Sequence, residues 1–300
     1  MITFRYHVVS LIAVFLALGL GILFGASFLE QSTLKLLQSA QTNLSTRNER
    51  LIKQVRELER ESRASAGLIK QSRADLVQGT LAGRAAVILS FDSTPGGIVD
   101  QIAATLGEAG AGIDGEIQLS SKLDMSNDPR RQQVALAIES ASTDPAVLSA
   151  DLVSRLSGAL SGKSVGFIQR LIDTDLAVAT KSQDAGARPA NALASPNTLV
   201  VIVSAGNKGD RKQLDTNFTN PLVKALSDAG VVVAVTEPGG TDLLLLPALR
   251  RNSDLHIVTV DGIELPRGQI ALALGLQAAL SGKFGHYGAG EGTSSPLPQP

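Results

Sequence analysis

The chain begins with a long uncharged stretch that is followed directly by a heptad repeat, and this pair most constrains the fold. Residues Val8 to Leu29 contain no charged side chain. As an α-helix, a stretch of this length is roughly 33 Å long, which is enough to cross a bilayer core. A cleaved signal peptide is the alternative, but the stretch is long for that role. We therefore predict a retained transmembrane anchor over residues 8–29.

The residues beside the anchor favour one orientation in the cell membrane. Arg5 and the α-amino group precede the anchor, and Glu30 is the first charge after it. Positive charge tends to remain on the cytoplasmic side of a membrane. We therefore predict a single-pass protein in which residues 1–7 form a cytoplasmic tail and the bulk of the chain is extracytoplasmic.

Small residues recur every four positions within the anchor and form one face of the predicted helix. Two membrane helices approach each other closely where small residues face each other, so this face predicts packing between anchors. The frequency of Gly and Ala in membrane helices is an equally good explanation. The residues concerned are Ala13, Ala17, Gly21 and Gly25.

A heptad repeat over residues 30–79 predicts a coiled-coil stalk. Four consecutive leucines occupy the d positions, and no Pro or Gly interrupts residues 30–66, which is typical of a coiled coil. Asn48 lies at an a position, where a single Asn is typical of parallel dimers. We therefore predict a homodimer, with an amphipathic helix folded onto its own domain as the alternative. The predicted interface consists of Leu34, Leu37, Leu44, Asn48, Leu51, Val55 and Leu58.

Short apolar runs alternate with amphipathic segments beyond the stalk, which predicts an α/β head with a mainly parallel sheet over residues 83–282. Two half-domains with a break near 162–197 are an alternative to one sheet. Residues 283–300 lack an apolar period and are predicted to be disordered. The predicted strands are 85–91, 115–119, 198–204, 231–236 and 256–260, and the predicted helices are 97–109, 131–140, 150–160, 220–229, 242–251 and 269–281.

The opening residues RYHVVSLIAVFLALGLGILFG, followed by the leucine heptads and a Cys-free α/β region, resemble the actinobacterial MctB family. The resemblance is specific in the anchor and extends over the whole chain in layout, whereas the head matches by architecture. It implies an envelope protein associated with copper transport or copper homeostasis. Because the family includes partners of a division-linked envelope protein, the resemblance also implies that the stalk and the head bind a partner protein.

The residues themselves offer little copper chemistry. Copper favours Cys and Met ligands or clustered imidazoles, whereas the chain has no Cys, two Met and three His. His7, His256 and His286 are far apart in the sequence and form no metal-ligand spacing. A single span also does not form a pore by itself. We therefore predict no metal site and an indirect role in copper homeostasis, with direct copper transport, as a channel component, as the alternative.

Composition restricts the other classes of partner. The formal net charge of −1 provides no basic excess for nucleic-acid binding. The absence of Cys excludes disulfides and suits an extracytoplasmic protein. We therefore predict membrane lipid, a second copy and an envelope protein as partners, with no nucleic acid and no cofactor.

Glycine-rich turns provide the basis for a second alternative, an enzyme or a nucleotide- or phosphate-binding domain. Residues 91–97 and 236–241 each contain Pro-Gly-Gly between a predicted strand and helix, but neither matches a known phosphate-binding motif. Tight turns explain both better. Lys208 and Asp210 follow another predicted strand and form a weak ligand-site candidate. Since no nucleophile–base pair is visible, we predict no catalytic residue and no enzyme.

Overall fold

The computed structural model describes the chain except residues 1–2, 165, 181–197, 205–211, 240–244 and 299–300; the side chains of residues 3, 5, 26–37 and 180 are also outside the description. The chain divides into two compact units, Met1–Ser65 and Ala66–Pro300. The first unit is helical, and the second contains the α/β head together with the last turns of the long helix.

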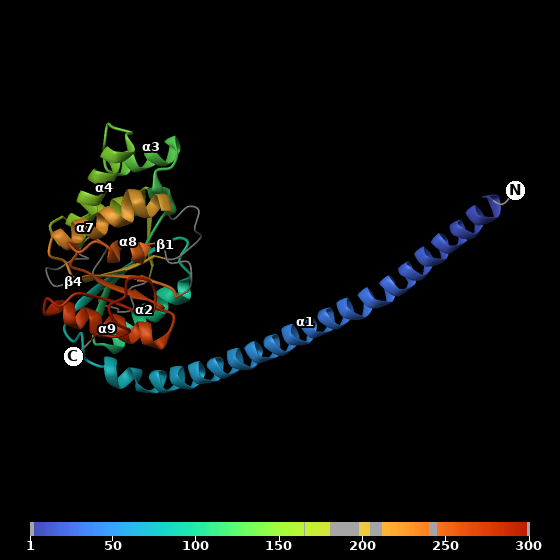
Figure 1. The fold of residues 1–300 in the computed structure, drawn as a ribbon. Helices are drawn as coiled ribbons and strands as arrows, with labels where there is room; N and C mark the ends of the chain where they lie inside the picture. Colours follow the sequence, from blue (N-terminus) through green and yellow to red (C-terminus); the bar gives the residue numbers. More distant parts are fainter. Residues whose placement is uncertain (1–2, 165, 181–197, 205–211, 240–244, 299–300) are drawn as a thin grey trace. The chain divides into compact units, whose positions relative to one another are not determined.

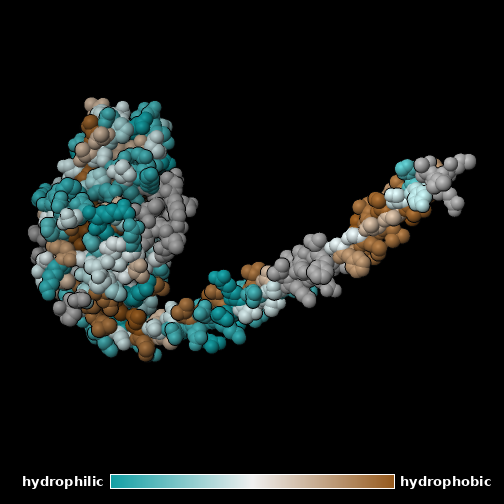
Figure 2. Space-filling view, in the orientation of Figure 1, coloured by the Kyte–Doolittle hydropathy of each residue, from teal (hydrophilic) through white to brown (hydrophobic). Residues whose placement is uncertain are grey.

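Helix α1 (Thr3–Val77) contains both the predicted anchor and the predicted stalk (Figure 1). Its stretch Tyr6–Gly25 has a mean hydropathy of 2.7 and is long and apolar enough to cross a membrane. Figure 2 shows apolar residues, in brown, covering this part of the helix. The prediction of an N-terminal apolar helix is therefore confirmed, because such a surface is suited to lipid rather than water.

Within the described part of the chain, seven strands form one sheet in the order β3-β2-β1-β4-β5-β6-β7. Every neighbouring pair is parallel except β2 and β3. The predicted α/β head with a mainly parallel sheet is therefore confirmed. The strands are β1 (Ala85–Phe91), β2 (Gly112–Leu119), β3 (Ala177–Thr180), β4 (Thr198–Val203), β5 (Val233–Glu237), β6 (Val258–Asp261) and β7 (Gly285–Tyr287).

Helices cover both faces of the sheet and form a three-layer head (Figure 1). Both faces of the sheet are apolar, because successive side chains of a strand point to opposite faces. In β1, Val87 and Leu89 pack into one core with α4 and α7, whereas Ala86 and Ile88 pack into another with α2 and α9. The helices are α2 (Gly96–Glu108), α3 (Asp128–Ala137), α4 (Pro145–Leu160), α5 (Phe167–Asp173), α7 (Asn220–Asp228), α8 (Leu245–Arg250) and α9 (Pro266–Leu280), with the short turns η1 (Ser121–Asp124) and η3 (Asp215–Thr219), the latter π-helical.

Side-chain caps define where two of these helices begin. The carboxylate of Asp144 accepts hydrogen bonds from the backbone N–H groups of Ala146 and Val147, at 2.9 and 3.2 Å, and Pro145 occupies the first position of α4. Asn127 caps α3 by accepting from the N–H of Arg130 at 3.0 Å. Both caps satisfy backbone donors that the helix itself leaves unpaired.

Two regions for which the sequence predicted no helix or strand contain such elements in the structure. The segment 162–197, where the sequence analysis allows a break between two half-domains, contains α5 and β3 among its described residues. The predicted disordered tail contains β7, which pairs in parallel with β6. Both strands are too short to show a hydrophobic period. The buried Arg250 holds β7 by donating to the carbonyl oxygen of Tyr287, and the buried Asp261 holds the residues after β7 by accepting from the N–H of Ala289.

Candidate functional site

An apolar stripe is exposed along the stalk part of α1. The side chains of Leu44, Leu51, Val55 and Leu58 are 68%, 52%, 53% and 65% exposed, respectively. Heptad spacing places them on one face of the helix, together with the exposed Asn48. Exposed apolar residues in a continuous row are typical of a surface that another chain covers. Leu34 and Leu37 lie within α1, but their side chains are outside the description.

The small-residue face of the anchor is also exposed. Ala13, Ala17, Gly21 and Gly25 lie within the apolar part of α1. A Cβ atom added at Gly21 or Gly25 meets no atom within 4 Å. This face therefore leaves room for a second helix, and its use in packing between anchors remains a prediction.

The polar groups of the two glycine-rich turns hold neighbouring loops in place. After β1, the carboxylate of Asp92 accepts from both the N–H and the hydroxyl of Ser121 at 2.9 Å. After β5, the N–H of Gly239 donates to both oxygens of Glu264 at 3.0 and 2.9 Å. The buried Glu237 accepts from the first two N–H groups of α8 at 3.4 and 3.0 Å. These contacts support tight turns.

Lys208 and Asp210, the weak ligand-site candidate, lie outside the described residues.

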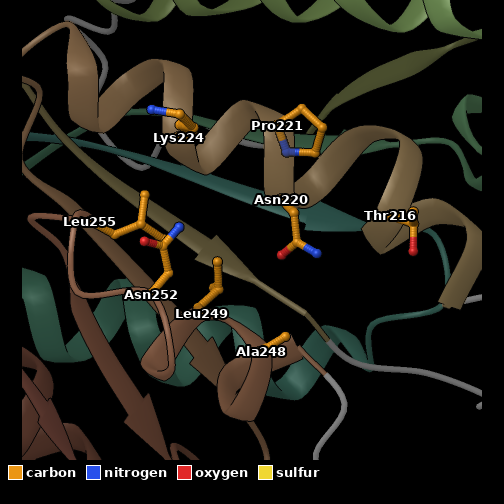
Figure 3. Close-up of a pocket in the computed structure, with 8 residues that line it drawn as sticks. All are labelled: Thr216, Asn220, Pro221, Lys224, Ala248, Leu249, Asn252 and Leu255. Atoms are coloured by element: carbon orange, nitrogen blue, oxygen red, sulfur yellow. The ribbon is translucent and has the colours of Figure 1, made fainter.

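A cavity of about 440 Å³ lies between α7 and α8 (Figure 3). The carboxamide of Asn220 enters it from one side and that of Asn252 from the other, above an apolar floor that includes Leu249. The Oδ1 atom of Asn220 is buried and has no hydrogen-bond partner among the residues that the structure describes. The lining consists of Thr216, Asn220, Pro221, Lys224, Ala248, Leu249, Asn252 and Leu255.

The charged residue of this cavity is poorly suited to catalysis. The Nζ atom of Lys224 donates to both carboxylate oxygens of Asp228, at 3.1 and 2.8 Å. This hydrogen bond and the accompanying charge attraction raise the pKa of Lys224 above its ordinary value of 10.5. An ammonium group that retains its proton does not act as a nucleophile or a general base. The cavity therefore offers hydrogen bonding and apolar contact rather than chemistry.

A buried ion pair lies near the C-terminus and has no counterpart among the sequence predictions. Arg250, at the end of α8, donates from Nη2 to Oδ2 of Asp261, at the end of β6, at 3.0 Å. Their side chains are 0% and 3% exposed. The sequence shows two signals of this ion pair: a basic residue at the end of an apolar helix and an acidic residue at the end of an apolar strand. Neither signal specified that the two residues pair.

The histidines lie in separate environments. The ring of His256 packs edge-on against Phe284 with 5.4 Å between ring centroids. His286 belongs to β7, and its Nδ1 lies 3.1 Å from the hydroxyl of Thr259. His7 lies near the start of α1. Among the described residues, no group of three or more His, Cys, Asp or Glu side chains is arranged to hold a metal ion.

Comparison with known proteins gives a match over nearly the whole chain. The family described as "Copper transport outer membrane protein, MctB" matches residues 1–298. The proteins named "Copper transporter MctB" from Mycobacterium tuberculosis H37Rv and Mycobacterium bovis are each 28% identical over 322 residues, which cover 98% of this chain and 98% of theirs. The protein of that name from Mycobacterium leprae is 28% identical over 328 residues, with 100% of both chains covered.

Proposed function

Because the chain belongs to the MctB family of copper transport proteins, we propose that it is a membrane-anchored envelope protein whose stalk and α/β head bind partner proteins. In this proposal its part in copper homeostasis is indirect. The observation that carries the proposal is the exposed apolar stripe of the stalk, from Leu44 to Leu58. The family description names copper transport, and we propose no enzymatic activity.

The stripe supports partner binding on energetic grounds. Fully burying a Leu or Val side chain contributes about 1.5–3 kcal/mol relative to leaving it in water. Leu44, Leu51, Val55 and Leu58 are all more than half exposed in the single chain. A second helix that covers all four therefore gains several such increments, less the cost of ordering the two chains.

We propose that the first partner of the stalk is a second copy of this chain. Asn48 interrupts the stripe at an a position, where two facing amide groups hydrogen bond and favour a parallel, in-register pair. Anchors in one membrane hold two copies in the same direction, and the exposed small residues of the anchor leave room for that pairing. The envelope protein partner then binds the paired stalk or the head.

The ligand chemistry supports an indirect role with copper. The chain lacks the thiolates that favour Cu(I), and it has only Met1 and Met125 as thioether donors. Met125 is buried in the core of the head. The two head histidines contact a phenyl ring and a threonine hydroxyl. A role through the envelope or through a partner protein needs no copper ligands from this chain.

Disulfide trapping tests the proposed dimer directly, because the natural chain contains no Cys. Val55→Cys places a thiol at an a position, where the two thiols of a parallel pair lie close enough to bond. We expect mild oxidation of membranes that contain this full-length variant to give a covalent dimer. Lys53→Cys is the control, because the f position faces away from the seam and is expected to remain monomeric.

A second pair of variants tests whether the stripe carries the binding. Leu44→Glu with Leu51→Glu places charges on the seam and is expected to abolish both the Val55→Cys crosslink and capture of the envelope partner by crosslinking pull-down. Asn43→Glu with Thr46→Glu adds the same charge on the opposite face and is expected to preserve both. Unchanged capture by the first variant, with the head folded, overturns the stalk as the binding element.

Direct copper transport is the second candidate, and the names of the family and of the mycobacterial relatives favour it. This candidate predicts copper-dependent flux across lipid vesicles that contain this protein alone. Vesicles prepared with the Leu44→Glu and Leu51→Glu variant provide the control for a pore built by the paired chain. Absence of flux with the natural protein removes direct transport and leaves the binding role.

A further inference from the structure

The C-terminal segment, defined here as residues 285–297, closes one edge of the sheet. Its strand β7 pairs in parallel with β6, and Thr259 lies opposite His286 in the register. On the other face of this pair, Tyr287 packs into the core beside α9. Gly275 of α9 leaves room for the Tyr287 ring, since a Cβ there comes within 3.0 Å of it. The segment therefore covers both the edge of β6 and part of the apolar core.

Two buried charges hold this segment in place. The carboxylate of Asp261 accepts from the N–H groups of Ala289 and Gly290 at 2.8 and 3.0 Å. The guanidinium of Arg250 donates to the carbonyl oxygens of Tyr287 and Glu291 at 3.1 and 3.0 Å. Since the two side chains also pair with each other, the C-terminal segment completes the hydrogen bonding of an ion pair that burial would otherwise make costly.

A chain of hydrogen bonds connects this ion pair to His286. The Nε of Arg250 donates to the hydroxyl oxygen of Thr259 at 2.9 Å, and that oxygen lies 3.1 Å from Nδ1 of His286. Among the contacts of the described residues, the Thr259 hydroxyl meets the guanidinium, which cannot accept a proton, and Nδ1, which can, so we assign the hydroxyl proton to the bond with Nδ1. The ring is therefore an acceptor at Nδ1 and is neutral.

A proton on Nδ1 disrupts this arrangement. The hydroxyl of Thr259 then faces two cationic donors and loses the acceptor for its own proton. From the other elements around β7, α8 contributes Arg250, the turn after it contributes the exposed Arg251, β6 contributes Asp261, and α9 carries Arg267 in its first turn. Glu291 pairs with Arg251 at 3.0 Å, and Asp261 is occupied by Arg250. Within the described part of the chain, both nearby carboxylates therefore contact partners other than the His286 ring.

The electrostatic environment of His286 also favours the neutral ring. Burial, followed by the charge of Arg250, lowers the pKa of the His286 ring below its ordinary value of 6.5. A lowered pKa in the folded state means that the unfolded segment binds the proton more tightly. The neutral His286 ring therefore stabilises the docked segment fully above pH 6.5, and this stabilisation is lost as the pH falls towards the lowered pKa.

We propose that the C-terminal segment is an acid-sensitive closure of the head, which stays docked on β6 while His286 is neutral and loosens when His286 takes up a proton. Loosening uncovers the backbone edge of β6 and the apolar side of Tyr287. The segment then changes the surface of the head in response to the acidity of the compartment in which the head lies.

Amide hydrogen exchange on the full-length protein in detergent micelles tests this closure. We expect protection of residues 285–297, corrected for intrinsic exchange rates, to fall between pH 7.5 and pH 5. The fall is expected to reach about tenfold per pH unit between the unfolded and folded pKa values, because one proton is taken up on opening. Protection in β1 and β4 is expected to remain unchanged, which separates local opening from unfolding of the head.

Variants separate His286 from the other titrating groups. His286→Asn places an amide oxygen where Nδ1 accepts the Thr259 proton, and it is expected to retain protection at both pH values. His286→Gln is the second neutral variant, used if the first does not fold. His256→Gln changes the other histidine of the head and is expected to behave like the natural protein. Protection that is independent of pH in the natural protein, or equally pH-dependent in a folded His286 variant, overturns the proposal.

Discussion

At the scale of single residues, the Arg250–Asp261 pair is the most deeply buried ion pair among the described residues. Replacement of Asp261 by Asn leaves a guanidinium that is 0% exposed without its counter-charge. We expect a loss of about 3–5 kcal/mol in the free energy of unfolding. Asp228→Asn is the matched control, because the Lys224–Asp228 pair is 59% and 58% exposed and such pairs contribute about 0–1 kcal/mol. Urea unfolding followed by circular dichroism measures both, and equal effects contradict the assignment.

Gly288 shows how closely the backbone of the C-terminal segment approaches this pair. Its φ is +132°, and an added Cβ lies 2.3 Å from the Asp261 carboxylate. We expect Gly288→Ala to cost more than the roughly 1–3 kcal/mol of backbone strain alone, because the carboxylate must also move. Gly282→Ala is the control, since Gly282 has a φ of +78° but no atom within 4 Å of its Cβ position. A similar unfolding midpoint for both variants shows that the close approach is unimportant.

At the scale of elements, Arg73 and the buried Val77 join the end of α1 to the head. Arg73 donates to the hydroxyl of Thr105 at 3.2 Å and also bonds Glu108 of α2 and Gln269 of α9. Its side chain is 20% exposed. We expect Arg73→Met to weaken docking of residues 66–77 by about 1–3 kcal/mol, because hydrogen bonds to a charged group are lost.

Local hydrogen exchange over residues 66–77 measures this docking. Arg63→Met is the control, because Arg63 and Glu59 form an ion pair in which both side chains are exposed, at 80% and 55%. Faster exchange in the Arg73 variant alone is the expected result. Equal exchange in both variants means that Val77 and its apolar neighbours hold the helix end without Arg73.

Elements with a strong local signal were predictable from the sequence, and elements that depend on distant contacts were not. The apolar run Ala85–Phe91 predicts β1 with the bounds that the structure shows. The predicted helix 150–160 begins five residues after the observed start of α4, because the Asp144 cap and Pro145 begin the helix ahead of its apolar period. Strand β2 begins before its predicted start, at Gly112, where Gly and Asp obscure the apolar pattern.

The same contrast between local signals and distant contacts applies to the candidate binding surfaces. The leucines of the stalk follow a local repeat, the heptad, and Leu44 and Leu51 are exposed in the structure. Their role in a coiled-coil interface stays a prediction. The connection from His286 through Thr259 to Arg250 joins three elements. No local period encodes it, so the three-residue strand β7 was predicted as part of a disordered tail.

At the scale of the whole molecule, the anchor and the head impose opposite requirements on their surroundings. The Tyr6–Gly25 stretch has a mean hydropathy of 2.7, whereas the head buries its apolar residues in two cores on either side of the sheet. A helix of this kind is stable in lipid and the head is stable in water. In the proposed membrane-anchored protein, the orientation across the membrane decides which partners the stalk and the head meet.

Labelling of single cysteines in spheroplasts tests the proposed orientation, with the cytoplasmic tail inside and the head outside. The natural chain has no Cys, so each variant carries one thiol. Ser253→Cys, at an exposed position of the head, is expected to react with a membrane-impermeant maleimide in intact spheroplasts. Thr3→Cys is expected to react only after permeabilisation, because Arg5 and the α-amino group favour the cytoplasmic side. The reverse pattern contradicts the orientation, and labelling of neither variant after permeabilisation identifies a failed reaction rather than a protected site.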